Sequence, residues 1–449
     1  MASRPQSRLG DVGWLLPAAW RSLPLAQTLR GLRPTAGARP RLYLLDPSYE
    51  QEIGHYGSVA RHLAEACAAR SWLFVHLTGP QDRPPNGPRI PWFRRDARLP
   101  MRIYRPELGP KVLHGIRGDT RRSLRVFIRD LGAALALDRL IFPEGEAYFF
   151  FYTGDLLHPW AYLERGPLGP RQHLAVFQFN LPPHFEKATQ QKRFSRHAKL
   201  LAQRLEAGKG ANATRVRLCT DSPALGRLLK PALGSSLAYA CPPLVGPEDL
   251  ETLPTPEEIA RRPHPLGYFG YLSEKHGWPI LRELLEAQAG RQSRWLLKIN
   301  PKRHPEDVAV AQQAATAAGA TLQLGFFPEA EYHASLDRCA SLLLPYRPQQ
   351  YAFLSSGKLI DALRHGCLPI VPANTWLAET VRQLDYGLVV APQYWGAVPA
   401  CLAVLDLPAL WARRRAAVRE FLGRFTAACL LDSLAAPVAR GPFEASGHP

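Results

Sequence analysis

The chain has 449 residues, 46% of them hydrophobic, which is enough for two or three domains with sizeable cores and excludes global disorder. A formal net charge of +18 favours anionic partners such as nucleotides, acidic lipid head groups or nucleic acid. The alternative is that the charge only reflects frequent Arg, Ala and Pro, as in many proteins from GC-rich genomes. The seven cysteines are widely spaced and form no C-x-x-C pair, which argues against a disulfide framework or a structural zinc site and favours a reducing compartment.

Residues 1–40 are rich in Arg, Pro, Gly and Ala and predict a basic, irregular N-terminal arm with one short amphipathic helix around residues 14–29. The sequence has no signal-peptide pattern and no window that approaches the ~18 apolar residues of a membrane span. We therefore expect a cytoplasmic protein, and a peripheral position at the cytoplasmic membrane face is the alternative that the basic charge suggests.

Apolar runs and amphipathic segments then alternate through residues 41–240, as in a Rossmann-like domain. Strands are predicted at residues 41–46, 72–77, 139–142, 173–179 and 216–220. Helices are predicted at residues 60–69 and 120–137, with a very basic helix at 184–205 and a Pro-rich loop at 80–110.

A Pro- and Glu-rich linker at residues 241–265 precedes a second alternating series at residues 266–395. Its predicted strands are 266–272, 295–299, 322–326, 341–345, 368–371 and 388–391, and its predicted helices are 278–289, 306–318, 329–339, 357–364 and 375–384. Residues 396–449 are expected to form C-terminal helices and a tail that pack back on the N-terminal domain. Two successive βαβ series predict an α/β protein with two doubly wound domains.

The most informative stretch is the loop that becomes the helix at residues 357–364. Ser355, Ser356, Gly357 and Lys358 stand at the helix N-terminus, where free N–H groups and the helix dipole favour an anion. Asp361 follows one turn later, where it could bond a sugar or ribose hydroxyl. The turn is not a P-loop, because the position of the earlier glycine is an alanine, and taken alone it could be only a helix cap.

Four segments in this order resemble glycosyltransferases of the GT-B fold, in particular the retaining family 4 or group 1 enzymes. These segments are residues 52–59, 268–278, 324–332 and 351–372. The resemblance implies two doubly wound Rossmann-like domains facing across a cleft, with the acceptor domain first and the nucleotide-sugar donor domain second.

The resemblance also implies a role for individual residues. The glycine-rich loop with His55 and Gly57 is similar to the loop that approaches the donor phosphates and the acceptor. In the second segment Lys275 matches the family's diphosphate-binding lysine, while Tyr271 replaces its arginine. Phe326 and Phe327 lie in the loop that resembles the base-holding loop. In the last segment Asp361 keeps the ribose-binding carboxylate, whereas Phe353 replaces the carboxylate that contacts the donor sugar, so Ser355 or Ser356 would take over.

Other residues complete the expected site. Lys275 and Lys358 would stabilise the leaving diphosphate, and His55 is the candidate base or acceptor contact. Glu144 and Glu146, expected just after a strand, are candidate acceptor-binding residues, with a structural role in the loop equally open. No metal-ligand spacing occurs, so no metal and no cofactor are expected besides the nucleotide-diphosphate sugar substrate.

The sequence therefore predicts a metal-independent, retaining glycosyltransferase that moves a hexose or related sugar to a polysaccharide, a glycolipid or another glycoconjugate acceptor. Two alternatives remain open. One is a catalytically degenerate GT-B scaffold that binds nucleotide or protein partners, suggested by Tyr271 and Phe353. The other is a nucleic-acid binder, suggested by the charge alone and ranked last because no nucleic-acid motif is present.

Overall fold

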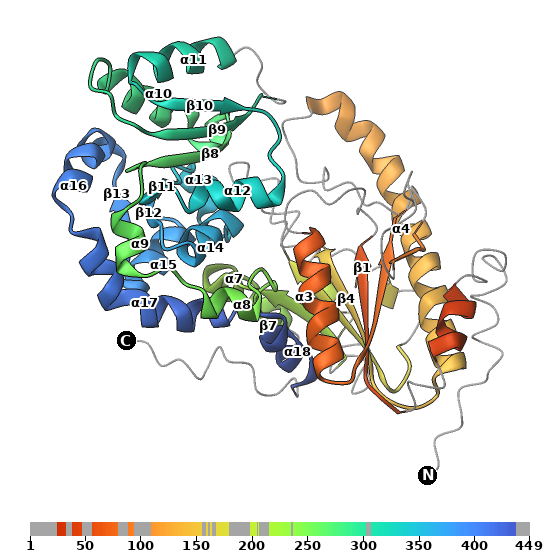
Figure 1. The fold of residues 1–449 in the computed structure, drawn as a ribbon. Helices are drawn as coiled ribbons and strands as arrows, with labels where there is room; N and C mark the ends of the chain where they lie inside the picture. The colour runs from red at the N-terminus through yellow and green to blue at the C-terminus, as the bar shows by residue number, and fades with distance from the viewer. Residues whose placement is uncertain are drawn as a thin grey trace. The chain divides into compact units, whose positions relative to one another are not determined.

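The structure is a computed structural model of the whole chain (Figure 1). It describes residues 25–32, 38–46, 56–79, 89–93, 109–154, 159, 162–163, 168–178, 198–203, 205, 215–234, 237–301 and 307–436. The chain divides into two compact units: unit 1 comprises Met1–Pro243 and Ala427–Pro449, and unit 2 comprises Leu244–Thr426.

Unit 1 contains a seven-stranded parallel sheet with the order β3-β2-β1-β4-β5-β6-β7. The central strands are continuous apolar runs, as expected for a parallel sheet with both faces covered. The strands are β1 (Arg41–Asp46), β2 (Leu73–Thr78), β3 (Arg89–Pro91), β4 (Ala147–Gly154), β5 (Gln172–Gln178), β6 (Val216–Thr220) and β7 (Leu237–Tyr239).

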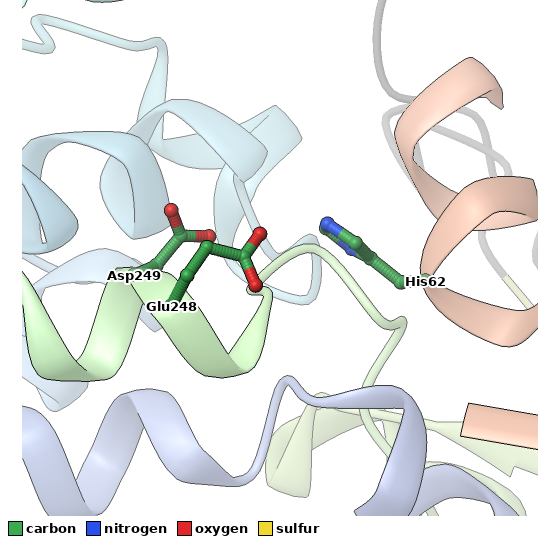
Figure 2. A group of neighbouring side chains, drawn as sticks. All are labelled: His62, Glu248 and Asp249. Carbon is green, nitrogen blue, oxygen red and sulfur yellow. The ribbon is translucent and has the colours of Figure 1, made fainter. Parts of the chain in front are cut away.

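The helices of unit 1 are α3 (Tyr56–Ala69), α4 (Gly109–Ile141), α7 (Pro223–Leu233) and α18 (Ala427–Ala435). The C-terminal helix α18 contacts α3, and Asp432 on α18 forms a bidentate pair with Arg70 at 2.6 and 2.9 Å. His62, on α3 (Figure 2), donates from Nδ1 to the Pro243 carbonyl at 3.0 Å. Of residues 396–449, expected to return to the N-terminal domain, only α18 belongs to unit 1 among those described.

One strand predicted in unit 1 is wrong, and the helix predicted at residues 120–137 is longer at both ends, since α4 runs from Gly109 to Ile141. Residues 139–141 continue α4 instead of forming a strand, and the strand that pairs with β1 is β4, which begins at Ala147. A buried ion pair explains why α4 extends this far: Asp138 Oδ1 accepts from Arg41 Nε at 2.8 Å and from the Tyr43 hydroxyl at 2.8 Å. Both partners of that ion pair have side chains only 1% exposed, so the helix must reach the sheet to satisfy them.

Unit 2 contains a six-stranded parallel sheet with the order β10-β9-β8-β11-β12-β13. The strands are β8 (Gly267–Tyr271), β9 (Leu296–Asn300), β10 (Thr321–Leu324), β11 (Ser341–Leu343), β12 (Leu368–Pro372) and β13 (Leu388–Val390). All six strands coincide with the segments predicted for them, and β9, β10 and β12 each extend one residue beyond the predicted segment. Side chains such as Leu281, Leu297 and Ile299 are fully buried in its core.

The helices of unit 2 are α8 (Pro247–Glu251), α9 (Pro256–Ala260), α10 (Trp278–Ala287), α11 (Val308–Ala317), α12 (Glu329–Leu336), α13 (Pro348–Tyr351), α14 (Gly357–Arg364), α15 (Trp376–Leu384), α16 (Val398–Val404) and α17 (Leu407–Gly423), with the 3-10 helices η6 (Glu274–His276) and η9 (Pro392–Ala397). The helix α17 packs on α9, α14 and α15. The segment expected to be a linker is therefore ordered against unit 2 through α8 and α9. Glu248 and Asp249 lie on α8 (Figure 2), and Asp249 pairs with Arg364 at 2.6 Å.

Within the described residues no single helix is long and apolar enough to cross a membrane. One pair of consecutive segments, Pro392–Val404 and Leu407–Gly423, passes the same test of length and composition together, across a bend of 97°. Of the predicted basic helix at residues 184–205, only residues 198–203 and 205 are described, and they are helical. Of the arm predicted at residues 1–40, residues 1–24 and 33–37 lie outside the described residues, and a short helix occupies residues 25–32.

Candidate functional site

The strand order of unit 2 reverses direction between β8 and β11, so that successive crossovers leave in opposite directions on either side of this point. Ligands of doubly wound sheets bind beyond the carboxyl ends of the strands at such a switch point. Three segments meet this edge in unit 2: the end of β8 with η6, the segment after β11, and the N-terminus of α14. These segments carry most of the donor-binding residues expected from the sequence.

The N-terminus of α14 presents backbone donors. Ser356 is the N-cap residue in an extended conformation, and its side chain makes no capping hydrogen bond. The first intrahelical bonds are donated by the N–H groups of Leu359 and Ile360 to the Ser356 carbonyl, at 3.0 and 3.3 Å. The N–H groups of Gly357 and Lys358 therefore precede the intrahelical ladder and are positioned for an anion, where the helix dipole also favours negative charge.

Lys358 places its amine over the end of β8. Its Nζ donates a hydrogen bond to the Phe269 carbonyl, and a Cβ atom added at Gly270 would lie 3.2 Å from Nζ. Burial lowers the pKa of Lys358 to about 8, and the Asp361 carboxylate opposes this shift only in part. An anionic ligand in the site would favour the protonated form and raise the pKa again. The lysine is therefore a cation that a phosphate would stabilise.

Asp361 lies one helical turn further along α14 and is only 2% exposed. Its Oδ2 accepts a hydrogen bond from the Tyr332 hydroxyl at 3.0 Å. Burial, and then the Asp361 charge, raise the pKa of the Tyr332 phenol well above its usual value, so the phenol stays a neutral donor. The carboxylate is thus oriented by a neutral hydroxyl.

Lys275 stands in η6, directly after β8, and its Nζ lies 5.7 Å from the centroid of the Tyr351 ring. The next glycine, Gly277, has φ +78°, and a Cβ atom there would lie 1.8 Å from the Pro345 carbonyl oxygen. The Arg347 N–H also donates to the Lys275 carbonyl at 3.2 Å. This close approach of two backbones holds the lysine against the segment that follows β11.

Aromatic rings fill the space beneath the lysines. Tyr346 and Tyr351 stack with ring centroids 4.2 Å apart, and the Tyr268 hydroxyl donates to the Tyr271 carbonyl at 2.8 Å. Burial raises the pKa of Tyr346 well above its usual value. These phenols are therefore neutral packing groups, and none of them adds negative charge against a phosphate.

The loop after β10 presents two phenylalanines of different exposure. Phe326 is 61% exposed, whereas the Phe327 ring has Lys298 Nζ at 4.0 Å from its centroid. Lys298 is itself buried and donates to Glu331 and to the Ser335 hydroxyl, both at 2.8 Å. The contact between Lys298 and the Phe327 ring thus holds the loop, while the ring of Phe326 is exposed and accessible to a ligand.

The remaining expected residues lie elsewhere. His55 is outside the described residues, and Gly57 is in the first turn of α3 in unit 1. Glu144 and Glu146 precede β4 and lie at the amino end of the strand, because the strand predicted before them is part of α4. Glu146 pairs with His173 at 2.6 Å, and the Glu144 carbonyl accepts from Arg41 at 2.8 Å. The reason for assigning them to the acceptor is therefore removed.

Three residues of the site received no individual role from the sequence, although two of them, Glu331 and Tyr332, lie in the segment 324–332. Tyr332, Lys298 and Glu331 are separated from their partners by 29 to 33 residues. The one local signal was Lys298 itself, a lysine in the middle of an otherwise apolar strand. A charged side chain in a buried strand requires a partner, and that requirement could have directed attention to carboxylates further along the chain, such as Glu331 on α12.

Two doubly wound units, each with the first strand beside the fourth at the point of reversal, make up the GT-B fold. Several solved structures share it at low sequence identity. Sucrose-phosphate synthase from Thermosynechococcus elongatus is 19% identical, with a TM-score of 0.57, and the match covers 88% of this chain and 98% of that one. WaaG, a glycosyltransferase involved in lipopolysaccharide biosynthesis, is 13% identical, with a TM-score of 0.53 and coverages of 88% and 99%.

The third structure is the trehalose-6-phosphate protein from E. coli bound with UDP-2-fluoro glucose. It is 12% identical, with a TM-score of 0.57, and the match covers 88% of this chain and 100% of that one. No protein-family model matches the chain, and no curated protein matches it by sequence. At these identities the comparisons establish the fold, and the chemistry must be argued from the residues of the site.

Proposed function

We propose that the protein is a glycosyltransferase that moves a sugar from a nucleotide-diphosphate sugar to an acceptor hydroxyl. The observation that carries this proposal is the arrangement on α14, where a helix N-terminus, the buried amine of Lys358 and the buried carboxylate of Asp361 lie within one turn at the switch point of the sheet. The binding of UDP-2-fluoro glucose by a structural neighbour supports this choice of donor.

Each group has a defined task in this proposal. The N–H groups of Gly357 and Lys358, together with the Lys358 amine, bind the diphosphate and stabilise the negative charge that grows on it as the sugar leaves. Lys275 adds a second cation from the end of β8. Asp361 accepts a hydrogen bond from a ribose hydroxyl, and Phe326 offers its exposed ring to the base.

We further propose that the reaction is retaining and independent of a metal ion. The cationic groups around α14 supply positive charge next to the leaving diphosphate. In a retaining transfer the departing phosphate oxygen can accept the proton of the acceptor hydroxyl, so no protein nucleophile is required. If transfer inverts the configuration, a base is required, and His55 is the candidate.

The proposed acceptor is a sugar hydroxyl of a glycan or glycolipid. The names of the neighbours include sucrose phosphate, trehalose-6-phosphate and lipopolysaccharide, each of which contains sugar units. The net charge of +18 suits a phosphorylated acceptor or an anionic membrane surface. We place the protein in the cytoplasm, with the membrane face as a site of peripheral binding.

Calorimetric titration of UDP-, GDP-, ADP- and dTDP-sugars into the full chain tests the proposal. We expect one nucleotide class to bind, and Lys358→Met to weaken that binding at least tenfold. Lys230→Met removes the same charge from the exposed face of α7 in unit 1 and should bind the donor as wild type does. Failure of every nucleotide sugar to bind would exclude the proposed glycosyltransferase activity.

A second candidate, a non-catalytic GT-B scaffold, is motivated by Tyr271 and Phe353, which replace polar groups of the family pattern. It predicts nucleotide binding with neither transfer nor donor hydrolysis. Release of free nucleotide from a bound nucleotide sugar, followed over hours, separates the two candidates, because the enzyme releases it and a scaffold does not.

A further inference from the structure

The Tyr332 side chain contacts both helix α14, through Asp361, and strand β8, through Phe269. Its hydroxyl donates to Asp361 Oδ2 at 3.0 Å, and its ring makes an edge-on contact with Phe269, with centroids 5.8 Å apart. The carbonyl of Phe269 is the group that accepts from Lys358. One tyrosine on α12 therefore contacts both the ribose-binding candidate and the residue that anchors the phosphate-binding lysine.

His333, the residue after Tyr332, makes a second contact between α12 and α14. It lies against His365, one helical turn after Asp361. His365 Nδ1 lies 2.6 Å from Asp337 Oδ1, so this nitrogen carries the proton, since the carboxylate can only accept. His365 Nε2 also lies 2.9 Å from His333 Nδ1, within hydrogen-bond distance. Residues 332 and 333 thus contact positions 361 and 365, and the two helices cannot slide past one another without breaking both contacts.

Asp361 makes its only side-chain hydrogen bond to the described part of the chain with Tyr332. A carboxylate that is 2% exposed needs its charge stabilised, and a single bond to Oδ2 does this while setting the direction of Oδ1. Replacing the tyrosine by phenylalanine would keep the ring contact with Phe269, so packing alone does not require the hydroxyl.

We propose that Tyr332 is a positioning residue that orients the Asp361 carboxylate. Oδ1 of Asp361 then accepts a hydrogen bond from a ribose hydroxyl of the donor nucleotide. This inference rests on the proposed function, because it assigns a ribose to Asp361. The site is therefore expected to discriminate ribonucleotides from their deoxy analogues through a residue that does not touch the ligand.

The test is a comparison of two variants with three ligands. Affinities for the nucleoside diphosphate that binds wild type, chosen from UDP, GDP and ADP, and for its 2′-deoxy and 3′-deoxy forms are measured by calorimetry. Tyr332→Phe should weaken binding of the ribonucleotide about 3- to 10-fold, which is the size of one oriented hydrogen bond. The deoxy form that wild type already binds more weakly should lose nothing further.

Tyr386→Phe is the matched control. Tyr386 is also buried in unit 2, and its hydroxyl donates to the Gly366 carbonyl at 2.6 Å. Removing it also removes one tyrosine hydroxyl bond, but not one to Asp361, so all three affinities should stay at wild-type values. Thermal unfolding of both variants monitors the general effect of losing a hydroxyl on the fold.

Two results overturn the inference in different ways. An equal loss for ribo and deoxy ligands, or no loss at all, shows that Tyr332 does not act through the ribose while the proposed function stands. If wild type binds none of the three diphosphates, the proposed function fails, and the inference fails with it.

Discussion

The amine of Lys358 donates a hydrogen bond to the backbone carbonyl of Phe269, which joins the first turn of α14 to strand β8. Gly270 leaves room for that amine, since a Cβ atom there would lie 3.2 Å from Nζ. The carbonyl carries no formal charge, so the lysine is desolvated without a hydrogen-bonded carboxylate. Such an arrangement disfavours the charged form in the free protein and is typical of positions that serve a ligand.

Lys358→Met should therefore stabilise the free protein. Because the pKa falls from 10.5 to about 8, the folded state binds fewer protons than the unfolded state between these values. The destabilisation is complete below pH 8 and disappears as the pH rises towards 10.5. We expect unit 2 of the variant to melt about 2–8 °C higher at pH 7, corresponding to roughly 1–3 kcal/mol, with little difference at pH 10.5.

Differential scanning calorimetry at both pH values checks this expectation, and Lys230→Met, at an exposed position, provides the comparison. A lower melting temperature for Lys358→Met at pH 7 would mean that the amine supports the fold and is not held there for a ligand.

Nucleoside diphosphate affinity should fall as the pH rises through about 8. The bound diphosphate requires protonated Lys358, and above the free-state pKa that proton must be taken up on binding. The dissociation constant then increases by up to about tenfold per pH unit. Titrations from pH 6.5 to 9.5 measure this slope, which should be absent in Lys358→Met. A wild-type affinity constant across the range would contradict a role for this proton.

Gly277→Ala should disrupt the site through the backbone. The residue has φ +78°, and the added Cβ would lie 1.8 Å from the Pro345 carbonyl oxygen, so the turn that carries Lys275 must move. We expect a loss of about 2–4 kcal/mol in stability and a donor affinity at least tenfold weaker. Urea unfolding and nucleotide titration report the two effects.

Gly290→Ala separates the cost of a left-handed backbone from the cost of the collision with Pro345. Gly290 has the same φ of +78°, yet no atom lies within 4 Å of its added Cβ. This variant should lose only about 1–2 kcal/mol, the cost of a left-handed alanine, and should bind donor normally. Equal losses in the two variants would show that the contact with Pro345 contributes nothing.

The sequence predicted the second sheet well because its strands are apolar runs separated by amphipathic helices of ordinary length. It failed at residues 139–142, where a short apolar run after a long helix looks the same whether it ends that helix or starts a strand. The deciding factor was the Arg41–Asp138 ion pair, formed by residues 97 positions apart. A contact of that range cannot be deduced from local periodicity.

The site shows the same division between local and long-range information. Ser356, Gly357, Lys358 and Asp361 are adjacent on one helix, so spacing and helix geometry were enough to group them. The bond from Tyr332 to Asp361 spans 29 residues and depends on how α12 packs on α14. The lowered pKa of Lys358 was equally out of reach, since it follows from burial against β8.

Phe326→Ala should weaken nucleotide binding without affecting the fold. The ring is 61% exposed on a loop that Phe327 anchors over Lys298, so little packing is lost, and the change in stability should stay within about 0.5 kcal/mol. Stacking of a base on an aromatic ring contributes about 1–3 kcal/mol, which predicts a dissociation constant about 5- to 150-fold higher. Tyr394→Ala removes an equally exposed ring, also 61%, from η9 of unit 2 and should leave the affinity unchanged.

Because the affinity lost in Phe326→Ala is assigned to the base, the loss should be much smaller for inorganic pyrophosphate than for the nucleotide. An equal loss for both ligands would place Phe326 at the phosphates and not at the base.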